Sequence, residues 1–309
     1  MKNQQIDYGD VIAKYPWIVE KNHNAILSPD IDGLLCGLLM STYLNWKIVG
    51  FYDGKNLLIK PGLSTKDCVF LDMEILRPDV RSAGHHLNVH MLSKPPDDYL
   101  QKMSNCINPN FIRGFDRAKT KLGRKYPLGA IHFLMYVLEN KSLGLISVKS
   151  DGLAPIFFGD GVWKILFKYT ANVLDWFDYL HSGAEAEWWK QLKSMSVIEL
   201  IEKMDVFLAA LAKIDATSYG HIPLEPFNPE ALDKTLNLLA RLTGWKHDPQ
   251  LWEVSGLRTH KFTKYIYGQP YGSSSNEKFF EIWALNPLSL AMTNGAVIQY
   301  TVEAPDKLP

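Results

Sequence analysis

The segment Leu27-Ser28-Pro29-Asp30-Ile31-Asp32-Gly33 places two carboxylates between a predicted strand and a predicted helix. Residues 24–28 form a short apolar run that is typical of a buried strand, and residues 34–44 form a longer run that is typical of a buried helix. Gly33 permits a tight entry into that helix. Ligands of open α/β sheets bind at the carboxyl ends of the strands, so Asp30 and Asp32 are candidate ligands of a divalent cation. The alternative is that one of them only caps the helix.

Two segments further along the chain supply the other residue types that a metal site needs. Residues 69–73 are a second apolar strand, which ends in the acid Asp72. The adjacent pair His85-His86 follows within the short polar stretch 81–90. Carboxylate and imidazole together are the ligands expected for Mn, Fe or Zn rather than for Ca. A histidine pair alone is common at surfaces and in cores, but its position after two strand-end acids favours a metal site.

The order of these motifs resembles the DHH phosphoesterase superfamily, which includes RecJ-like nucleases, oligonucleotide-degrading nucleases and manganese pyrophosphatases. Asp30 and Asp32 match the Asp-x-Asp of its first motif, and Asp72 matches the strand-end Asp of its second. His85-His86 match the histidine pair of the motif that names the family. The resemblance covers about residues 20–165.

The fourth motif of that family is an Asp after a further strand. Asp160 is the preferred match, because the apolar run 155–158 leads into it and a glycine lies on either side. Asp151 lies at a similar distance and is the competing candidate.

Two positions depart from the family pattern. Gly84 stands where the namesake Asp of the family lies, so the first histidine lacks its usual neighbouring carboxylate. A further His or Asp normally precedes Asp-x-Asp, whereas the corresponding residues here are Ile26 and Ser28. Three outcomes stay open: one tightly held ion with a second weak one, a ligand borrowed from His90 or Asp151, or a binding-only member.

The resemblance implies a ligand set and a reaction. One or two Mn²⁺ ions, with Mg²⁺ as an alternative, would be held by Asp30, Asp32, Asp72, His85 and Asp160. Asp72 would bridge the ions, and a metal-bound water would attack phosphorus in line. His86 and the nearby Arg81 would contact the phosphate. The expected catalytic residues are therefore Asp72, His85, His86 and Arg81.

The expected function is hydrolysis of phosphodiester bonds in a nucleic acid or a nucleotide. Two alternatives stay open. The same metal core supports a phosphoanhydride hydrolase that acts on pyrophosphate or polyphosphate. The departures from the family pattern also fit a catalytically weakened nucleotide-binding subunit of a larger assembly, and a homo-oligomer is a further expectation.

Composition predicts a globular protein of the cytoplasm without identifying its substrate. The 309 residues carry 33 basic and 33 acidic side chains, so the chain lacks the basic excess of general nucleic-acid binders. The 47% of hydrophobic residues suffices for a large core. No signal peptide or membrane span is expected, because the first residues lack an apolar core and no apolar run of about 20 residues occurs. The widely spaced cysteines predict buried thiols of a reducing compartment: Cys36, Cys68 and Cys106.

Alternating strands and helices predict an α/β fold with a mostly parallel sheet flanked by helices. A helical connector begins near Val162, and a smaller α+β domain with a hairpin turn at Asn294-Gly295 ends the chain. The predicted boundaries are a phosphoesterase domain over residues 1–195 and a substrate-selecting domain over residues 196–309.

The C-terminal part departs from RecJ-like proteins, many of which carry a Gly-Gly-Gly-His signature there. No Gly-Gly pair occurs in this chain. Arg258, His260 and Lys261 instead form a basic group followed by tyrosines, and we expect these three residues to bind substrate. The alternative is an ordinary solvated edge strand protected by its lysine.

Aromatic residues and one histidine in the predicted helices have two interpretations. Trp176, Trp188 and Trp189 are suited to stacking on bases, but packing is the more common role of such residues. His132 lies on an apolar helix over residues 126–140 and is expected to belong to the core rather than to a metal site.

Overall fold

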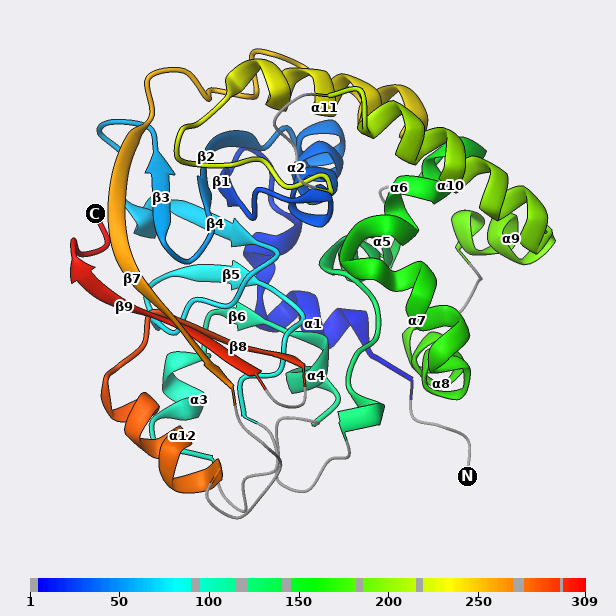
Figure 1. Ribbon diagram of the computed structural model, residues 1–309. Coiled ribbons are helices and arrows are strands. Elements are labelled where there is room, and N and C mark those ends of the chain that lie inside the picture. Colours follow the sequence, from blue (N-terminus) through cyan, green and yellow to red (C-terminus); the bar gives the residue numbers. More distant parts are fainter. Residues whose placement is uncertain are drawn as a thin grey trace.

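A nine-stranded sheet organises the fold in the computed structural model, which describes residues 5–89, 95–114, 122–140, 146–181, 186–214, 219–268, 275–294 and 297–309 (Figure 1). The strand order is β6-β5-β4-β1-β2-β3-β7-β9-β8. The strands are β1 (Asn24–Leu27), β2 (Lys47–Tyr52), β3 (Asn56–Ile59), β4 (Cys68–Leu71), β5 (Arg81–Ala83), β6 (Cys106–Ile107), β7 (Arg258–Gly268), β8 (Ser289–Asn294) and β9 (Val297–Pro305).

Helices occur between the strands and in a long run between β6 and β7. They are α1 (Tyr8–Lys14), α2 (Ile31–Leu44), α3 (Tyr99–Lys102), α4 (Pro109–Ile112), α5 (Ala130–Asn140), α6 (Leu153–Phe158), α7 (Val162–Lys168), α8 (Thr170–Leu180), α9 (Glu187–Ser194), α10 (Val197–Leu211), α11 (Pro229–Thr243) and α12 (Ser275–Ala284). The α/β class is as predicted. None of the helices in the described ranges has the length and apolar character needed to cross a bilayer.

The sheet is mixed, so the prediction of a mostly parallel sheet is wrong. Strands β2, β1, β4, β5 and β6 are parallel neighbours, whereas β3, β7, β9 and β8 are each joined by antiparallel pairing. The short connection between β2 and β3 leaves no room for a crossover helix, which parallel pairing requires. The sheet therefore changes from parallel to antiparallel at β3.

The C-terminal strands extend this sheet. The first residues of β7 pair with β3, and the rest of this long strand pairs with β9. Strands β8 and β9 form the predicted hairpin, since Asn294 pairs with Val297; Gly295 itself lies outside the described residues. The division at residue 195 stays a prediction, but residues 258–305 contribute strands to the same sheet as the N-terminal part.

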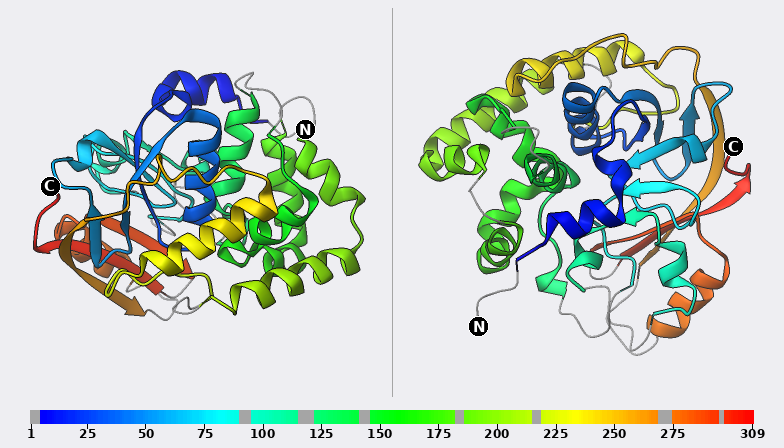
Figure 2. Two further views of the ribbon diagram at one scale, coloured as in Figure 1. Left: turned by 90° about the horizontal axis from the view of Figure 1, so that it is seen from above. Right: turned by 180° about the vertical axis from the view of Figure 1, so that it is seen from behind.

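Helix α2 forms the centre of the core. It is apolar on all sides, and twelve of its fourteen residues are buried, as expected for a helix that is covered all round. It contacts β1 on one side and α5, α6 and α11 on others. Helices α5 to α10 gather on one side of the molecule, whereas β7–β9 and α12 lie on the opposite side (Figures 1 and 2). The first turn of α2 thus lies between the sheet and the helices.

Helix α6 corrects one local prediction. The apolar run before Asp160 was expected to be a strand, but Leu153–Phe158 is helical. Leu153, Ile156 and Phe157 are all fully buried, and their spacing of three and four residues is that of one helix face. A short apolar run of this length fits a strand or a buried helix equally, and packing against α2 and α10 decides between them.

The core position of His132 and the packing role of the tryptophans agree with the prediction. His132 is fully buried on α5, and its ring packs against Phe157 and Trp188. Burial lowers the pKa of His132 to about 3, so the ring is neutral. Trp176 is also fully buried, and Trp189 stacks on Phe177. The three cysteines are buried and free, as expected.

Candidate metal centre

Four side chains converge where β1, β4 and β5 end. Asp32 lies in the first turn of α2, Asp72 directly follows β4, and His85 follows β5. Asp160 follows α6 and approaches from the helical side. Each residue offers one ligand atom, and these four atoms all lie within 4.8 Å of one another. They meet because β1, β4 and β5 are adjacent parallel strands, whose carboxyl ends share one edge of the sheet.

The imidazole of His85 lies at the centre of this group. Its Nδ1 atom is 3.4 Å from Oδ1 of Asp72 and 3.9 Å from Oδ2 of Asp32. Its Nε2 atom is 3.2 Å from Oδ2 of Asp160. Asp32, Asp72 and His85 are buried, and Asp160 lies on the more exposed side. Both nitrogens of one ring therefore face carboxylates.

Asp32 is held by the beginning of α5. Its Oδ2 accepts a hydrogen bond of 2.6 Å from the backbone N–H of Ala130, and its Oδ1 accepts one of 3.0 Å from that of Ile131. A Cβ atom on Gly129 would lie 2.6 Å from Oδ2 of Asp32, so glycine is required for this close approach. The positive end of the helix dipole favours a carboxylate at this position. This contact fixes the orientation of Asp32.

The electrostatics of the four residues favour a bound cation. Burial raises the pKa of Asp32 well above its usual value, and the carboxylates of Asp72 and Asp160 raise it further. Burial raises the pKa of Asp72 in the same way, with additional repulsion from Asp30 and Asp160. Oδ1 of Asp72 and Nδ1 of His85 are buried, and although they lie 3.4 Å apart they form no hydrogen bond with each other or with another described residue. A divalent cation would neutralise the crowded carboxylates and provide the partner that these two atoms lack.

Two of the four residues adopt an unusual backbone conformation. Asp72 has φ of 65° and Asp160 has φ of 53°, which is the left-handed region. Only Gly, Asn and Asp visit this region readily. Such conformations persist where the surrounding structure imposes them, and they are frequent at functional sites.

Other predicted site residues do not belong to this group of four, although Asp30 lines the same cavity as Asp72. Asp30 is the N-cap of α2, because its Oδ1 accepts a hydrogen bond of 3.0 Å from Gly33, so the capping alternative holds for Asp30 and not for Asp32. Asp151 forms an ion pair with Lys203 instead of joining the four residues. His90 lies outside the described residues.

Arg81 is separated from the predicted phosphate site. It begins β5, whereas His85 follows the end of that strand. Its guanidinium donates to the backbone carbonyl of Lys66 and lies 3.5 Å from Nδ1 of His23. Both partners precede strands, so Arg81 is at the opposite edge of the sheet from the acidic residues. The sequence placed it near His86 only because the two residues are five positions apart.

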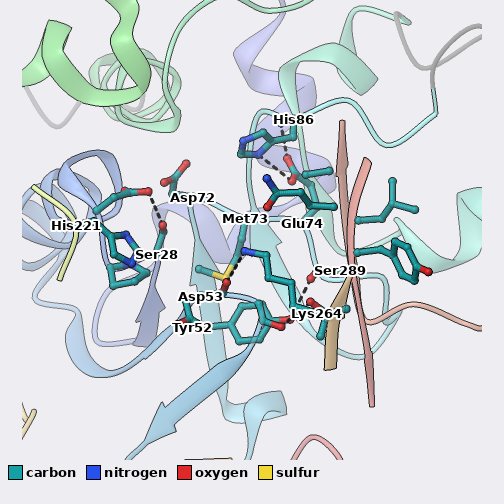
Figure 3. A pocket seen from close by; sticks show the side chains of 18 residues that line it. Ser28, Tyr52, Asp53, Asp72, Met73, Glu74, His86, His221, Lys264 and Ser289 are labelled. Atoms are coloured by element: carbon teal, nitrogen blue, oxygen red, sulfur yellow. Dashed lines mark hydrogen bonds and ion pairs between the residues drawn. The ribbon is translucent and has the colours of Figure 1, made fainter. Parts of the chain in front are cut away.

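A cavity of about 230 Å³ reaches the group of four residues at Asp72 (Figure 3). We refer to Asp32, Asp72, His85 and Asp160 as the metal-ligand group. Asp72 belongs both to this group and to the cavity wall. His86 and Glu74 line the same side, and the opposite side is formed by β7, β8 and β9. Lys264 projects into the cavity from β7 and donates a hydrogen bond of 2.8 Å to the backbone carbonyl of Asp53. Burial lowers the pKa of Lys264.

The three basic residues expected to bind substrate do not line this cavity. Arg258, His260 and Lys261 lie in the part of β7 that pairs with β3. Lys261 forms an ion pair with Glu225. Their role in substrate binding stays a prediction, while Lys264, three residues further along the strand, is the basic residue of β7 that reaches the cavity.

Sequence reasoning missed three residues. Lys264 projects into the cavity, and Glu74 and Asn108 form hydrogen bonds with the backbone of His86. Lys264 belongs to the same basic segment as Lys261, and nothing in the sequence tells which lysine faces a cavity. Glu74 carried a usable signal, because it is an acid between the apolar residues Met73 and Ile75. Asn108 gave no signal, since its role depends on contacts with residues far away in the chain.

Comparison with models of protein families, with curated proteins and with solved structures found no significant match.

Proposed function

We propose that this protein is a metal-dependent phosphoesterase that hydrolyses phosphodiester bonds of a nucleotide or a nucleic acid, in the manner of the DHH superfamily. The observation that carries the proposal is the group of Asp32, Asp72, His85 and Asp160 at the edge of a cavity, of which the first three are buried. Three carboxylates and one imidazole form a suitable ligand set for Mn²⁺, with Mg²⁺ as the alternative. Asp30 is engaged as a helix cap, which leaves four candidate ligands. Four ligands support one bound ion more strongly than two bound ions.

The chain's own residues have distinct roles in this proposal. A divalent ion held by the four residues would supply Lewis-acid stabilisation of charge on a phosphoryl oxygen and would lower the pKa of a water molecule. His86 and Lys264 lie on different walls of the cavity, so they can orient a phosphoryl group from two sides. Asp72 links the two regions, because it belongs to the ligand group and to the cavity wall.

A nucleotide-binding subunit with weakened catalysis is the second candidate. The observation that favours it is the engagement of Asp32, both of whose oxygens already accept hydrogen bonds from α5. This engagement weakens Asp32 as a ligand. A phosphoanhydride hydrolase is supported by the same four residues, and a cavity of about 230 Å³ suits a small substrate.

Metal binding and turnover of bis(4-nitrophenyl) phosphate test the proposal. We expect the purified protein to bind about one Mn²⁺ per chain and to hydrolyse this phosphodiester faster with Mn²⁺ than with Mg²⁺, with no turnover in Ca²⁺, because the site includes an imidazole. Calorimetry and absorbance measurements would provide both readouts. Bound metal without turnover would favour the binding subunit, release of phosphate from pyrophosphate alone would favour the anhydride hydrolase, and turnover without metal would contradict all three.

Replacement of Lys264 by Met should weaken substrate binding and leave the metal site intact. The change keeps the apolar stem and removes the donor that faces the cavity. A hydrogen bond from a charged donor contributes about 1.5–3 kcal/mol, so KM should rise about tenfold or more. Steady-state kinetics with bis(4-nitrophenyl) phosphate would measure this change.

Lys246 provides the matched control, because its ammonium is exposed and paired with Asp248, and it does not line the cavity. Lys246→Met should therefore behave as the unaltered protein. An unchanged KM in Lys264→Met would show that β7 supplies no phosphate contact.

A further inference from the structure

Glu74 is a buried acid next to the metal-ligand group but outside it. Only 2% of the residue is exposed. Its Oε1 atom accepts hydrogen bonds of 2.7 Å from the backbone N–H of His86 and 2.8 Å from Nδ2 of Asn108. Its Oε2 atom lies 3.4 Å from Nδ1 of His86 (Figure 3). One carboxylate thus contacts both the backbone and the ring of His86.

The carboxylate of Glu74 occupies the space that a side chain at position 84 would need. A Cβ atom on Gly84 would lie 2.3 Å from Oε1 of Glu74 and 2.8 Å from the carbonyl carbon of Met73. The backbone of Gly84 is not in the left-handed region, so its torsion angle alone does not require glycine. Glycine at this position is explained by the approach of Glu74 together with that of the Met73 backbone. Position 84 carries no acid, but the carboxylate of Glu74, from the segment that follows β4, lies beside it.

The rest of the His86 environment is also fixed. Its ring stacks on that of His85, with centroids 4.2 Å apart and an interplanar angle of 29°. Nδ2 of Asn108 donates a hydrogen bond of 2.7 Å to the backbone carbonyl of His86, so Asn108 connects Glu74 and His86. With Nδ1 directed at Glu74, the Nε2 atom is left for a ligand, and His86 lines the cavity.

We propose that Glu74 is a positioning residue, which orients the imidazole of His86 so that Nε2 meets a phosphoryl oxygen of a substrate in the cavity. A carboxylate that accepts a hydrogen bond from Nδ1–H fixes the orientation of the ring, and Nε2 donates to a phosphoryl oxygen when it too carries a proton. Loss of such a partner commonly costs 10–100-fold in function. The inference rests on the proposed phosphoesterase function for the identity of the ligand. The contacts between Glu74 and His86 do not depend on it.

Glu74→Gln is the discriminating substitution. The amide oxygen can still accept from the backbone of His86 and from Asn108, but an NH₂ group then faces Nδ1 of the ring. We expect the variant to keep Mn²⁺ stoichiometry and affinity, because Glu74 is not among the four ligand residues. Calorimetric binding of inorganic phosphate in the presence of Mn²⁺ should weaken about tenfold, as should kcat/KM for bis(4-nitrophenyl) phosphate. The side-chain ¹⁵N shifts of His86 should report the changed tautomer.

Two further variants are measured beside Glu74→Gln. Glu139→Gln is the control, since Glu139 is a half-buried acid of α5 that does not line the cavity. Phosphate binding by this variant should be unchanged. Gly84→Ala retains both Glu74 and His86 but places a methyl group against the carboxylate and against the Met73 backbone. It should therefore weaken phosphate binding as Glu74→Gln does, which keeps a readout available if one variant fails to fold.

Two outcomes would overturn the inference, and a third would overturn only the proposed function. Normal phosphate binding in Glu74→Gln together with weakened binding in His86→Ala would show that His86 needs no positioning by Glu74. Loss of Mn²⁺ from Glu74→Gln would make Glu74 part of the metal site. If the unaltered protein hydrolyses no phosphoester but Glu74→Gln still weakens phosphate binding and shifts the His86 signals, the proposed function fails and the positioning role stands.

Discussion

Replacing Asp72 by Asn should abolish tight Mn²⁺ binding and lower phosphodiester turnover by about 100-fold or more, since loss of even an outer partner of a metal ligand costs about 10–100-fold. Asp72 is buried, its Oδ1 lacks a hydrogen-bond partner within the described residues, and it belongs to both the ligand group and the cavity wall. Asn is the appropriate replacement, because Asp72 has φ of 65° and Asn tolerates this region better than Ala. A change in fold is therefore not expected.

The stability of Asp72→Asn gives a second readout. In the absence of metal, the substitution removes one of three crowded carboxylates, so its melting temperature should equal or exceed that of the unaltered protein. In the unaltered protein, free Mn²⁺ at 100 times Kd should add about 2.7 kcal/mol to the free energy of unfolding, and the variant should gain nothing. Differential scanning fluorimetry with and without Mn²⁺ would measure both effects.

Asp79→Asn is the control for this experiment, because Asp79 is an exposed acid that pairs with Lys66 at the surface. It should keep metal binding and turnover. Full turnover and unchanged metal content in Asp72→Asn would contradict the phosphoesterase proposal.

Asp160→Asn should lose metal affinity and turnover by a similar factor, whereas Asp151→Asn should stay near the unaltered protein. Asp160 is 3.2 Å from Nε2 of His85, while Asp151 pairs with Lys203 near the surface. Asn again fits the backbone, since φ of Asp160 is 53°. Loss of a ligand from a set of four is expected to cost at least as much as loss of an outer partner, about 10–100-fold.

The comparison of these two acids uses the same measurements, Mn²⁺ calorimetry and turnover of bis(4-nitrophenyl) phosphate. The two substitutions are chemically identical and lie nine positions apart, so each is the control of the other. Turnover lost in Asp151→Asn and kept in Asp160→Asn would reverse the assignment of the fourth motif.

Local patterns in the sequence predicted the elements that surround the site. The apolar runs before Asp30 and Asp72 are strands, and the run after Gly33 is the buried helix α2. The structure brings together four of the five side chains expected as ligands, namely Asp32, Asp72, His85 and Asp160. Their function as ligands stays a prediction. The pattern was informative here because strand ends that are adjacent and parallel necessarily share one edge of the sheet.

The sequence was less informative where a short apolar run fitted both a strand and a helix, and where the partner of a strand lay far away in the chain. The run 153–158 is apolar enough for a strand and a helix, and contacts with α2 and α10 make it helical. The parallel character of the sheet was overestimated, because β7 pairs with β3, about 200 residues earlier in the chain. Such a pairing leaves no local trace in either strand.

The sequence by itself determined which chemical groups are available: acids at strand ends, a histidine pair, a glycine at position 84 and a basic segment near the C-terminus. Only the tertiary structure decided which of them meet. It directs Asp32 rather than Asp30 toward His85, selects Asp160 over Asp151, brings Lys264 rather than Lys261 to the cavity, and places Glu74 in the space beside Gly84. The physical reason is that residue types and periodicities act locally, whereas the direction of a side chain toward a distant partner depends on how whole strands and helices pack.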